Sequence, residues 1–330
     1  MQAEGYIELV NQGLESFLDT KIQAAKNPKI KLLLKQQSRV IIGGKRLRPR
    51  LLFVGYQVFG GSQPESLVRV GIAIELLHQA LLVHDDLIDQ DLYRRGQPNV
   101  MGQRKQATNA SGLLIGDLLL NWVNELVASD PGLSNEHKLA VIELLTHYLD
   151  LTIEGQVLDA LNTYDLSIKP GELDKINELK TSSYSTLLPL AMVAQLLNIS
   201  KSARLKLDSF ANSLGRFLQL NNDIEDYLSP VARLSDYQGA KVTLPYLTLL
   251  NNATHVHKHI LAKSFGHKLT TEERNNVRKV AQQVLTKEVL DQLTHSYYNK
   301  VIYDLDKLAL KPNSRASFIS IIDDLKPQAV

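Results

Sequence analysis

The sequence predicts an all-helical protein. Apolar residues recur at the i, i+3, i+4 spacing of a helix along most of the 330 residues, and no stretch shows the alternation of a half-buried strand. Eleven prolines and few glycine clusters divide the chain into long stretches, without an internal repeat, a low-complexity segment or a linker. We therefore expect one helical domain with a single core, covering residues 1–330.

The elements follow in order from the apolar period and from the residues that end helices. The predicted helices cover residues 4–25, 29–41, 48–59, 65–90, 104–128, 134–160, 172–198, 203–228, 240–264, 271–290 and 315–325. The third should stop at Gly60-Gly61, and Pro64 should begin the next. Pro189 and Pro245 fall inside helical patterns and should kink them. The segment 291–314 shows little periodicity and lies outside the predicted helices.

The composition is that of an ordinary globular protein, with 44% hydrophobic residues. Lysine and arginine total 37 against 35 for aspartate and glutamate, and the net charge of +2 argues against nucleic acid as the main partner. Because there is no cysteine, disulfides, thiolate metal sites and a cysteine nucleophile are excluded. The opening MQAEGYIELVNQ lacks a signal segment, and no apolar run reaches the roughly 20 residues of a membrane span. We therefore expect a cytoplasmic protein.

An apolar run followed by three carboxylates is the most informative stretch of the chain. Residues 71–83 are almost wholly apolar, and Asp85, Asp86 and Asp89 follow them. On a helix, Asp85 and Asp89 lie one turn apart on one face, with Asp86 close to both. An oxygen-rich cluster without sulfur suits Mg²⁺, which usually also binds substrate phosphates. The stretch predicts a magnesium site for a phosphorylated ligand; the alternative, a solvated acidic helix end, is disfavoured by the apolar residues before it.

A second acidic patch ends another apolar helix. It reads Asn222-Asp223-Ile-Glu-Asp226 and repeats the spacing of the first, with Asn222 where the first has Asp85. If the two helices face each other across a bundle, their carboxylates converge on a cavity mouth and can hold several Mg²⁺ ions around a diphosphate. The alternative is that the last acids of this patch are surface charges.

Basic residues beside glycines supply the positive charge that a diphosphate needs. GGKRLRP places two glycines before Lys45 and Arg48 and opens a helix at Pro49, which offers free backbone N–H groups and a guanidinium fork to an anion. A glycine helix stop followed by solvated basic residues is an equal alternative. His78 lies two turns before the first acid on nearly the same face, although a lone histidine on an apolar helix is usually a core residue.

Further cations lie near the acids and near the prolines. Arg94 and Arg95 follow the first patch closely enough to reach the same mouth, although such a pair is more often a pair of surface charges. Lys180-Thr181 and Lys241 each precede a helix-kinking proline and are candidates for phosphate contacts.

Taken in order, these motifs resemble a known family. GGKRLRP, HQALLVHDDLID, RRGQP, GDLLL, EGQVLD, KTSSYS and the patch from Gln219 to Asp226 occur in the order and spacing of the trans-isoprenyl diphosphate synthases, also called polyprenyl synthetases. The resemblance spans about residues 40–250. It implies a single large helical bundle of the isoprenoid synthase type with a central cavity. It also implies head-to-tail condensation of isopentenyl diphosphate with an allylic diphosphate (geranyl, farnesyl or geranylgeranyl), a homodimer, and a membrane-seeking product.

The resemblance gives each motif residue a role. The Mg²⁺ ligands and the carboxylates that support them would be Asp85, Asp86, Asp89, Asp223 and Asp226. The other contacts of the allylic diphosphate would be Arg94, Lys180 and Lys241. The isopentenyl diphosphate cradle would be Lys45, Arg48, His78 and Arg95. Thr181 and Gln219 would face the developing carbocation. Such chemistry needs charge neutralisation and a dry apolar pocket, and no protein nucleophile.

Four positions depart from the family pattern. Asn222 replaces the usual first Asp of the second patch, which removes a charge. The others are Leu218 for Phe, Asn99 for Thr and Ala240 for Gly. A non-catalytic partner, or one subunit of a heteromeric synthase, stays an alternative, but the first patch and its cations are intact. A class I terpene cyclase is disfavoured, because Asp226 and Pro230 stand where its second motif needs Ser or Thr and Glu.

Product length depends on how far the growing chain runs along the helix behind the first acids, at about one helix turn, roughly 5.4 Å, per isoprene unit. The residues on that path are Leu81, Ala80, Leu77 and Ile74. In short-product members a bulky aromatic fills the position of Ala80, so we expect a medium- or long-chain all-trans product, longer than geranylgeranyl. A geranylgeranyl-length product is an alternative because Leu81 is large, and Ala80 could instead allow another helix to pack closely.

Overall fold

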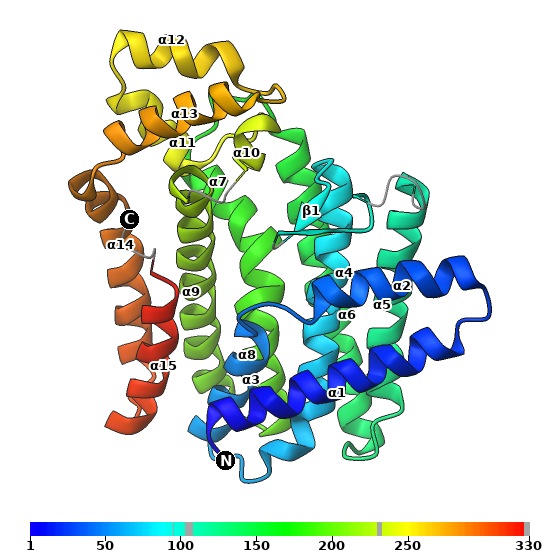
Figure 1. Ribbon diagram of the computed structural model, residues 1–330. Coiled ribbons are helices and arrows are strands. Elements are labelled where there is room, and N and C mark those ends of the chain that lie inside the picture. The colour runs from blue at the N-terminus through cyan, green and yellow to red at the C-terminus, as the bar shows by residue number, and fades with distance from the viewer. Residues whose placement is uncertain (95, 103–107, 230–232, 327–330) are drawn as a thin grey trace. The chain divides into compact units, whose positions relative to one another are not determined.

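Figure 1 shows the computed structural model of the chain, which describes residues 1–94, 96–102, 108–229 and 233–326. Helices form nearly all of its regular structure, which confirms the predicted all-α fold. The chain divides into two compact units, Met1–Thr146 with Pro189–Ser200, and His147–Leu188 with Lys201–Val330. A single domain over residues 1–330 stays a prediction.

The first unit is built around one long apolar helix. That helix is α4 (Val68–Ile88), and it packs against α1, α3 and α5. The elements of the unit in chain order are α1 (Ala3–Ala24), α2 (Pro28–Ile41), α3 (Leu47–Val58), the 3₁₀ helix η1 (Pro64–Leu67), α4, the strands β1 (Tyr93–Arg94) and β2 (Gln97–Pro98), α5 (Asn109–Ala128), the first part of α6 (Asn135–Leu161), and α8 (Leu188–Leu196) from Pro189 onward.

Two helix boundaries in this unit follow the predicted signals. Gly60 has φ +96°, directly after α3, and Pro64 begins η1. The structure adds two N-caps that were not predicted: the side chains of Asn27 and Thr108 accept hydrogen bonds from the first turns of α2 and α5. The start predicted at residue 104 falls in a segment, 103–107, outside the described residues. The short hairpin of β1 and β2 was not predicted, because two-residue strands carry no alternation.

By length and composition, Glu65–Ile88 is apolar enough to cross a membrane, which differs from the expectation that no run would reach that length. In the fold, 67% of its most apolar window is buried inside the protein. A core helix passes the same test, so this stretch is weak evidence for a membrane span.

The second unit surrounds α9 (Lys201–Leu228), which packs against helices that precede and follow it in the chain (Figure 1). The other elements are the end of α6, α7 (Pro170–Asn177), the π-helical segment η2 (Glu178–Leu187), α10 (Ser235–Gln238), α11 (Leu244–Asn252), α12 (His255–Ser264), α13 (Thr271–Val284), α14 (Lys287–Asp306) and α15 (Pro312–Asp324). Threonine begins four of these helices as an N-cap, at Thr243, Thr254, Thr270 and Thr286.

Two helix predictions in this unit were wrong. The single helix expected over 240–264 is two helices, α11 and α12, and Pro245 lies in the first turn of α11 instead of kinking a longer helix. The helix expected over 271–290 ends at Val284, and α14 then covers most of the segment left unassigned. In each case the threonine cap restarts a helix within a continuous apolar pattern.

Candidate active site

The acids of the first patch lie at the end of α4, and Arg94 folds back onto them. Its Nε donates to Asp86 Oδ1 at 2.7 Å, and its Nη2 lies 3.6 Å from Asp85 Oδ2. Asp89 is the C-cap of the helix, and its N–H donates to the carbonyl of Asp85 at 2.8 Å. The structure therefore brings together the three acids and one of the two arginines predicted beside them; Arg95 lies outside the described residues.

Asp86 is the most enclosed of these acids, with 3% of its surface exposed. Burial raises the pKa of Asp86 to about 6, and the negative charge of Asp85 adds to the rise, while the charge and hydrogen bond of Arg94 oppose it. The cation thus offsets only part of the desolvation, so the carboxyl still binds a proton more readily than an exposed aspartate does.

The loop that carries Arg94 is held by Asn99, one of the departures from the family pattern. Its Nδ2 donates to the carbonyl of Asp91 at 2.9 Å, and its Oδ1 accepts from the N–H of Gly102 at 2.9 Å. Asn99 is buried, at 2% exposure. Because an amide has both a donor and an acceptor, the side chain of Asn99 connects the backbone before Arg94 to the backbone after it.

The predicted anion cradle also lies in the first unit. Lys45 is exposed, Arg48 is buried at 8% exposure, and His78 on α4 is half-buried. α3 begins at Leu47, earlier than the start predicted at Pro49. The first helical turn therefore begins three residues after Gly44.

The residues predicted to set product length lie along α4. Ile74, Leu77 and Ala80 are buried at 0–2% exposure, and Leu81 is half-buried. α5 packs closely on this helix: a Cβ added at Gly116 would lie within 3.0 Å of the His84 ring. Ala80 precedes His84 by one turn, so close packing of α5 contributes to its burial.

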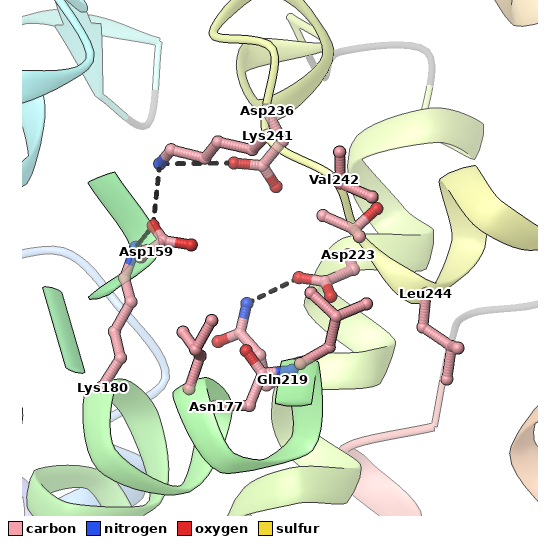
Figure 2. Close-up of a pocket in the computed structure, with 12 residues that line it drawn as sticks. Asp159, Asn177, Lys180, Gln219, Asp223, Asp236, Lys241, Val242 and Leu244 are labelled. Atoms are coloured by element: carbon pink, nitrogen blue, oxygen red, sulfur yellow. Dashed lines mark hydrogen bonds and ion pairs between the residues drawn. The ribbon is translucent and has the colours of Figure 1, made fainter. Parts of the chain in front are cut away.

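The second unit holds a pocket lined by four of the predicted site residues (Figure 2). Lys180 comes from η2, Gln219 and Asp223 from α9, and Lys241 from the segment after α10. Two acids that the sequence analysis did not assign, Asp159 and Asp236, also line it.

Two glycines allow the π-helical segment η2 to lie close to its neighbours. A Cβ at Gly155 of α6 would lie 2.6 Å from the Cα of Lys180, and one at Gly215 of α9 would lie 2.6 Å from the Cα of Ser182. Both distances are shorter than side chains tolerate, so only glycine permits these approaches. Such π segments are frequent at functional sites. This segment precedes Pro189, where the sequence predicted a distorted helix.

A chain of hydrogen bonds connects η2 to the second acidic patch. Thr181 Oγ1 donates to Gln219 Oε1 at 2.7 Å. Gln219 Nε2 in turn donates to Asp223 Oδ1 at 2.6 Å, as Figure 2 shows. Asp223 is 4% exposed, and burial raises its pKa well above the ordinary value, with the charge of Asp236 adding to the rise. Because Gln219 accepts from Thr181 and donates to Asp223, its side-chain amide is fixed in one orientation.

Asp159 contacts both lysines of the pocket. Its Oδ2 lies 2.6 Å from Lys180 Nζ and 3.7 Å from Lys241 Nζ, and Asp236 Oδ1 lies 3.6 Å from the same Lys241 Nζ (Figure 2). Asp159 is the last residue of EGQVLD, which was a motif of the resemblance without an assigned role. Asp159 and Asp236 therefore offset part of the positive charge of the two lysines.

The residues of the second acidic patch do not all face the pocket, although their spacing repeats that of the first patch. The Asp226 carboxylate accepts from the N–H groups of Ser235 and Asp236 at 3.3 and 3.4 Å, so it anchors the start of α10. Asn222 is exposed and does not line the pocket, whereas Asp223 does. The metal roles of Asp223 and Asp226 stay predictions.

The carboxylates of the two patches suit Mg²⁺ if substrate phosphates supply the remaining ligands of the ion. Within the described residues, no group of three or more His, Asp or Glu could hold a metal ion by itself. Mg²⁺ is usually held by one or two carboxylates, with water and substrate phosphates completing its shell. Asp85 and Asp89 in the first unit, and Asp223 in the second, supply oxygen donors of that kind.

Comparison with known proteins gives one consistent result. The sequence pattern of the family described as polyprenyl synthetase matches residues 31–284. The farnesyl diphosphate synthase of Haemophilus influenzae is 27% identical over 292 residues, covering 86% of this chain and 97% of that protein. The geranylgeranyl diphosphate synthase of Sulfolobus acidocaldarius is 30% identical over 279 residues, covering 82% of each.

A solved structure shows the same fold. The geranylgeranyl pyrophosphate synthase from Corynebacterium glutamicum, complexed with isoprenyl diphosphate and magnesium, superimposes with a TM-score of 0.82 at 20% identity, over 98% of this chain and 99% of that one. With a family pattern that covers most of the chain and a relative at 30% identity over 82% of it, the chain belongs to the polyprenyl synthetase family.

Proposed function

We propose that this protein is a trans-prenyltransferase that condenses isopentenyl diphosphate head-to-tail with an allylic diphosphate. The observation that carries the proposal is the family match over residues 31–284, which includes the acids of α4 and the pocket lined by Lys180, Gln219 and Lys241. The farnesyl and geranylgeranyl diphosphate synthases among its relatives support the same reaction class.

The side chains suit ionisation of an allylic diphosphate. Mg²⁺, when bound, would neutralise much of the charge on the leaving diphosphate. Arg94 would contact the allylic diphosphate beside the first acids, and Lys180 and Lys241 would do so in the pocket by exchanging Asp159 for phosphate oxygens. Thr181 and Gln219 would present fixed oxygen dipoles where positive charge develops.

One assay tests the proposal. The purified chain alone is incubated with Mg²⁺, isopentenyl diphosphate and farnesyl diphosphate. We expect diphosphate release and a longer prenyl diphosphate. If neither is formed, the non-catalytic partner, or a subunit that needs a second chain, becomes the better account.

We further propose a product longer than geranylgeranyl diphosphate, because Ala80 places no bulky group behind the acids. Ala80→Phe should cap the product at C15 to C20 and leave the first condensation intact. Mass analysis of the products measures this. An unchanged length in the variant would show that the tail does not pass Ala80. Wild-type product that stops at geranylgeranyl would instead favour the shorter alternative, for which the size of Leu81 is the supporting observation.

We also propose a cytoplasmic homodimer. α6 leaves Ile153, Val157 and Leu161 exposed at 49%, 53% and 74%, one helix turn apart on one face. An aliphatic stripe of this kind is typical of an interface, and a second copy of the chain presents the same stripe in return. Light scattering of the purified chain should give twice the monomer mass; a monomer that is active would contradict the dimer.

A further inference from the structure

Arg46 stands between the predicted cradle residues Lys45 and Arg48, yet its side chain points into the protein. It is 3% exposed, and every nitrogen of its guanidinium donates a hydrogen bond. The acceptors are Asn11 Oδ1 at 2.7 Å, Glu75 Oε1 at 2.7 Å, and the carbonyls of Ile41, Ile42 and Gly43 at 3.0, 2.6 and 3.1 Å. Three of these acceptors belong to the turn that leads into the cradle, so the guanidinium holds that turn together.

The backbone of this turn has a positive φ on both sides of Lys45, and the non-glycine residue there, Arg46, is strained. Gly44 has φ +120°, and Arg46 has φ +50° at the N-cap of α3. A left-handed conformation costs a residue with a Cβ about 1–2 kcal/mol. Such a residue persists only where its surroundings hold it. The bonds of the Arg46 side chain supply that hold.

Glu75 connects the turn to α4. The Arg46–Glu75 ion pair has both side chains at 2% exposure, and Glu75 Oε1 also accepts from Gln79 Nε2 at 2.8 Å. His78 lies one helix turn after Glu75, so one buried pair fixes the turn to the part of α4 that carries the third cradle residue. Because the pair is neutral as a whole, it does not cancel the positive charge that Lys45 and Arg48 bring to the cradle.

We propose that Arg46 is a positioning residue that acts through Glu75: it holds the turn before α3 so that Lys45, Arg48 and His78 form one cradle for isopentenyl diphosphate. The identity of that anion rests on the proposed function. Arg46 itself is buried and does not contact the substrate.

A double variant separates positioning from stability. Arg46→Met with Glu75→Leu replaces the buried pair by apolar groups, which is often neutral for stability because no unpaired charge is left behind. No unpaired charge remains, but the carbonyls of Ile41, Ile42 and Gly43 lose their donor, so the free energy of unfolding should fall by about 1–3 kcal/mol. Amide exchange at Gly43, Gly44 and Lys45 should become faster.

The decisive readout is the pair of substrate KM values. In the double variant we expect the KM for isopentenyl diphosphate to rise roughly tenfold or more, and the KM for the allylic substrate and kcat to change by less than about twofold. Arg46→Lys should recover little, because an ammonium cannot make the five bonds of the fork. Asp304→Asn, at a 1% exposed acid of a separate ion pair, is the control for a loss of stability alone and should leave both KM values unchanged.

Two failures can be told apart by calorimetry with isopentenyl diphosphate. If the wild type neither binds it nor turns over, the proposed function fails. If the wild type binds it and the double variant binds equally well, or if both KM values rise together, the positioning role of Arg46 is refuted while the proposed function stands.

Discussion

The close approach of η2 to α9 predicts a large effect for a single added methyl group. In Gly215→Ala, the new Cβ would lie 2.6 Å from the Cα and 2.5 Å from the Cβ of Ser182, within a range that real Cβ atoms essentially never occupy. The backbone of η2 would have to move by about 0.4 Å to bring that Cα to 3.0 Å. A small end group could rotate away, but a backbone atom cannot.

The magnitude follows from two opposing terms. Overpacking of a core contact typically costs about 1–3 kcal/mol. Alanine in a helix recovers about 1 kcal/mol relative to glycine. We therefore expect Gly215→Ala to lower the free energy of unfolding by up to about 2 kcal/mol, and to weaken the contact between Thr181 and Gln219 because η2 carries the threonine.

Urea denaturation followed by circular dichroism measures this change. Gly171→Ala is the matched control: Gly171 also lies in a helix, α7, and an added Cβ there meets nothing within 4 Å. The control should be neutral or slightly stabilising. If both variants were equally stable, the close approach of η2 to α9 would make no measurable contribution to stability. The requirement for glycine at position 215, opposite Ser182, would then be refuted.

Three further predictions concern single residues. Ala240→Gly should raise the free energy of unfolding by about 0.5–1 kcal/mol in thermal or urea unfolding, because Ala240 has φ +55° and glycine adopts that conformation without strain; a loss of stability would contradict this. Burial raises the pKa of Asp86 from 3.8 to about 6, so the folded chain binds more protons than the unfolded chain between these pH values. In EDTA, the free energy of unfolding should therefore fall as the pH rises from about 4 to 6, by at most about 3 kcal/mol. Asp86→Asn should flatten that slope, and an equal slope in the variant would remove Asp86 as its source. Asp89→Ala should abolish Mg²⁺-dependent turnover and leave the circular dichroism of the fold unchanged; turnover near the wild-type level would exclude Asp89 as a ligand.

The helices of the first unit could be predicted because local signals agree there. Asn27 begins α2 and Gly60 follows α3, and both stand where the apolar period also starts or stops. In the last third of the chain the signals disagree. The apolar period continues across Thr254 and Thr286, where the chain ends one helix and begins another, and a threonine inside a continuous pattern does not by itself reveal a cap.

The site shows the same division between local and distant information. Asp85, Asp86 and Asp89 are close in sequence, so helix geometry alone places them together. Asp236 lies five residues before Lys241, joined by a turn that follows no helical spacing, whereas Asp159 on α6 is far from Lys241 in the sequence. Such contacts depend on packing, which the sequence pattern does not specify.

Helix geometry also accounts for the departure at Asn222. Gln219 and Asp223 lie one turn apart on α9 and share its pocket-facing side, whereas a residue one position earlier is turned by about 100° around the helix axis. Asn222 is accordingly exposed, and the missing charge falls on a side chain that does not line the pocket. The carboxylate that does line it, Asp223, is held by Gln219 and sits within the electrostatic reach of Asp159 and Asp236. In this chain the negative charge opposite the two lysines comes from three separate elements, α6, α9 and α10, so reading the second patch as a linear motif underestimates the acids available to the pocket.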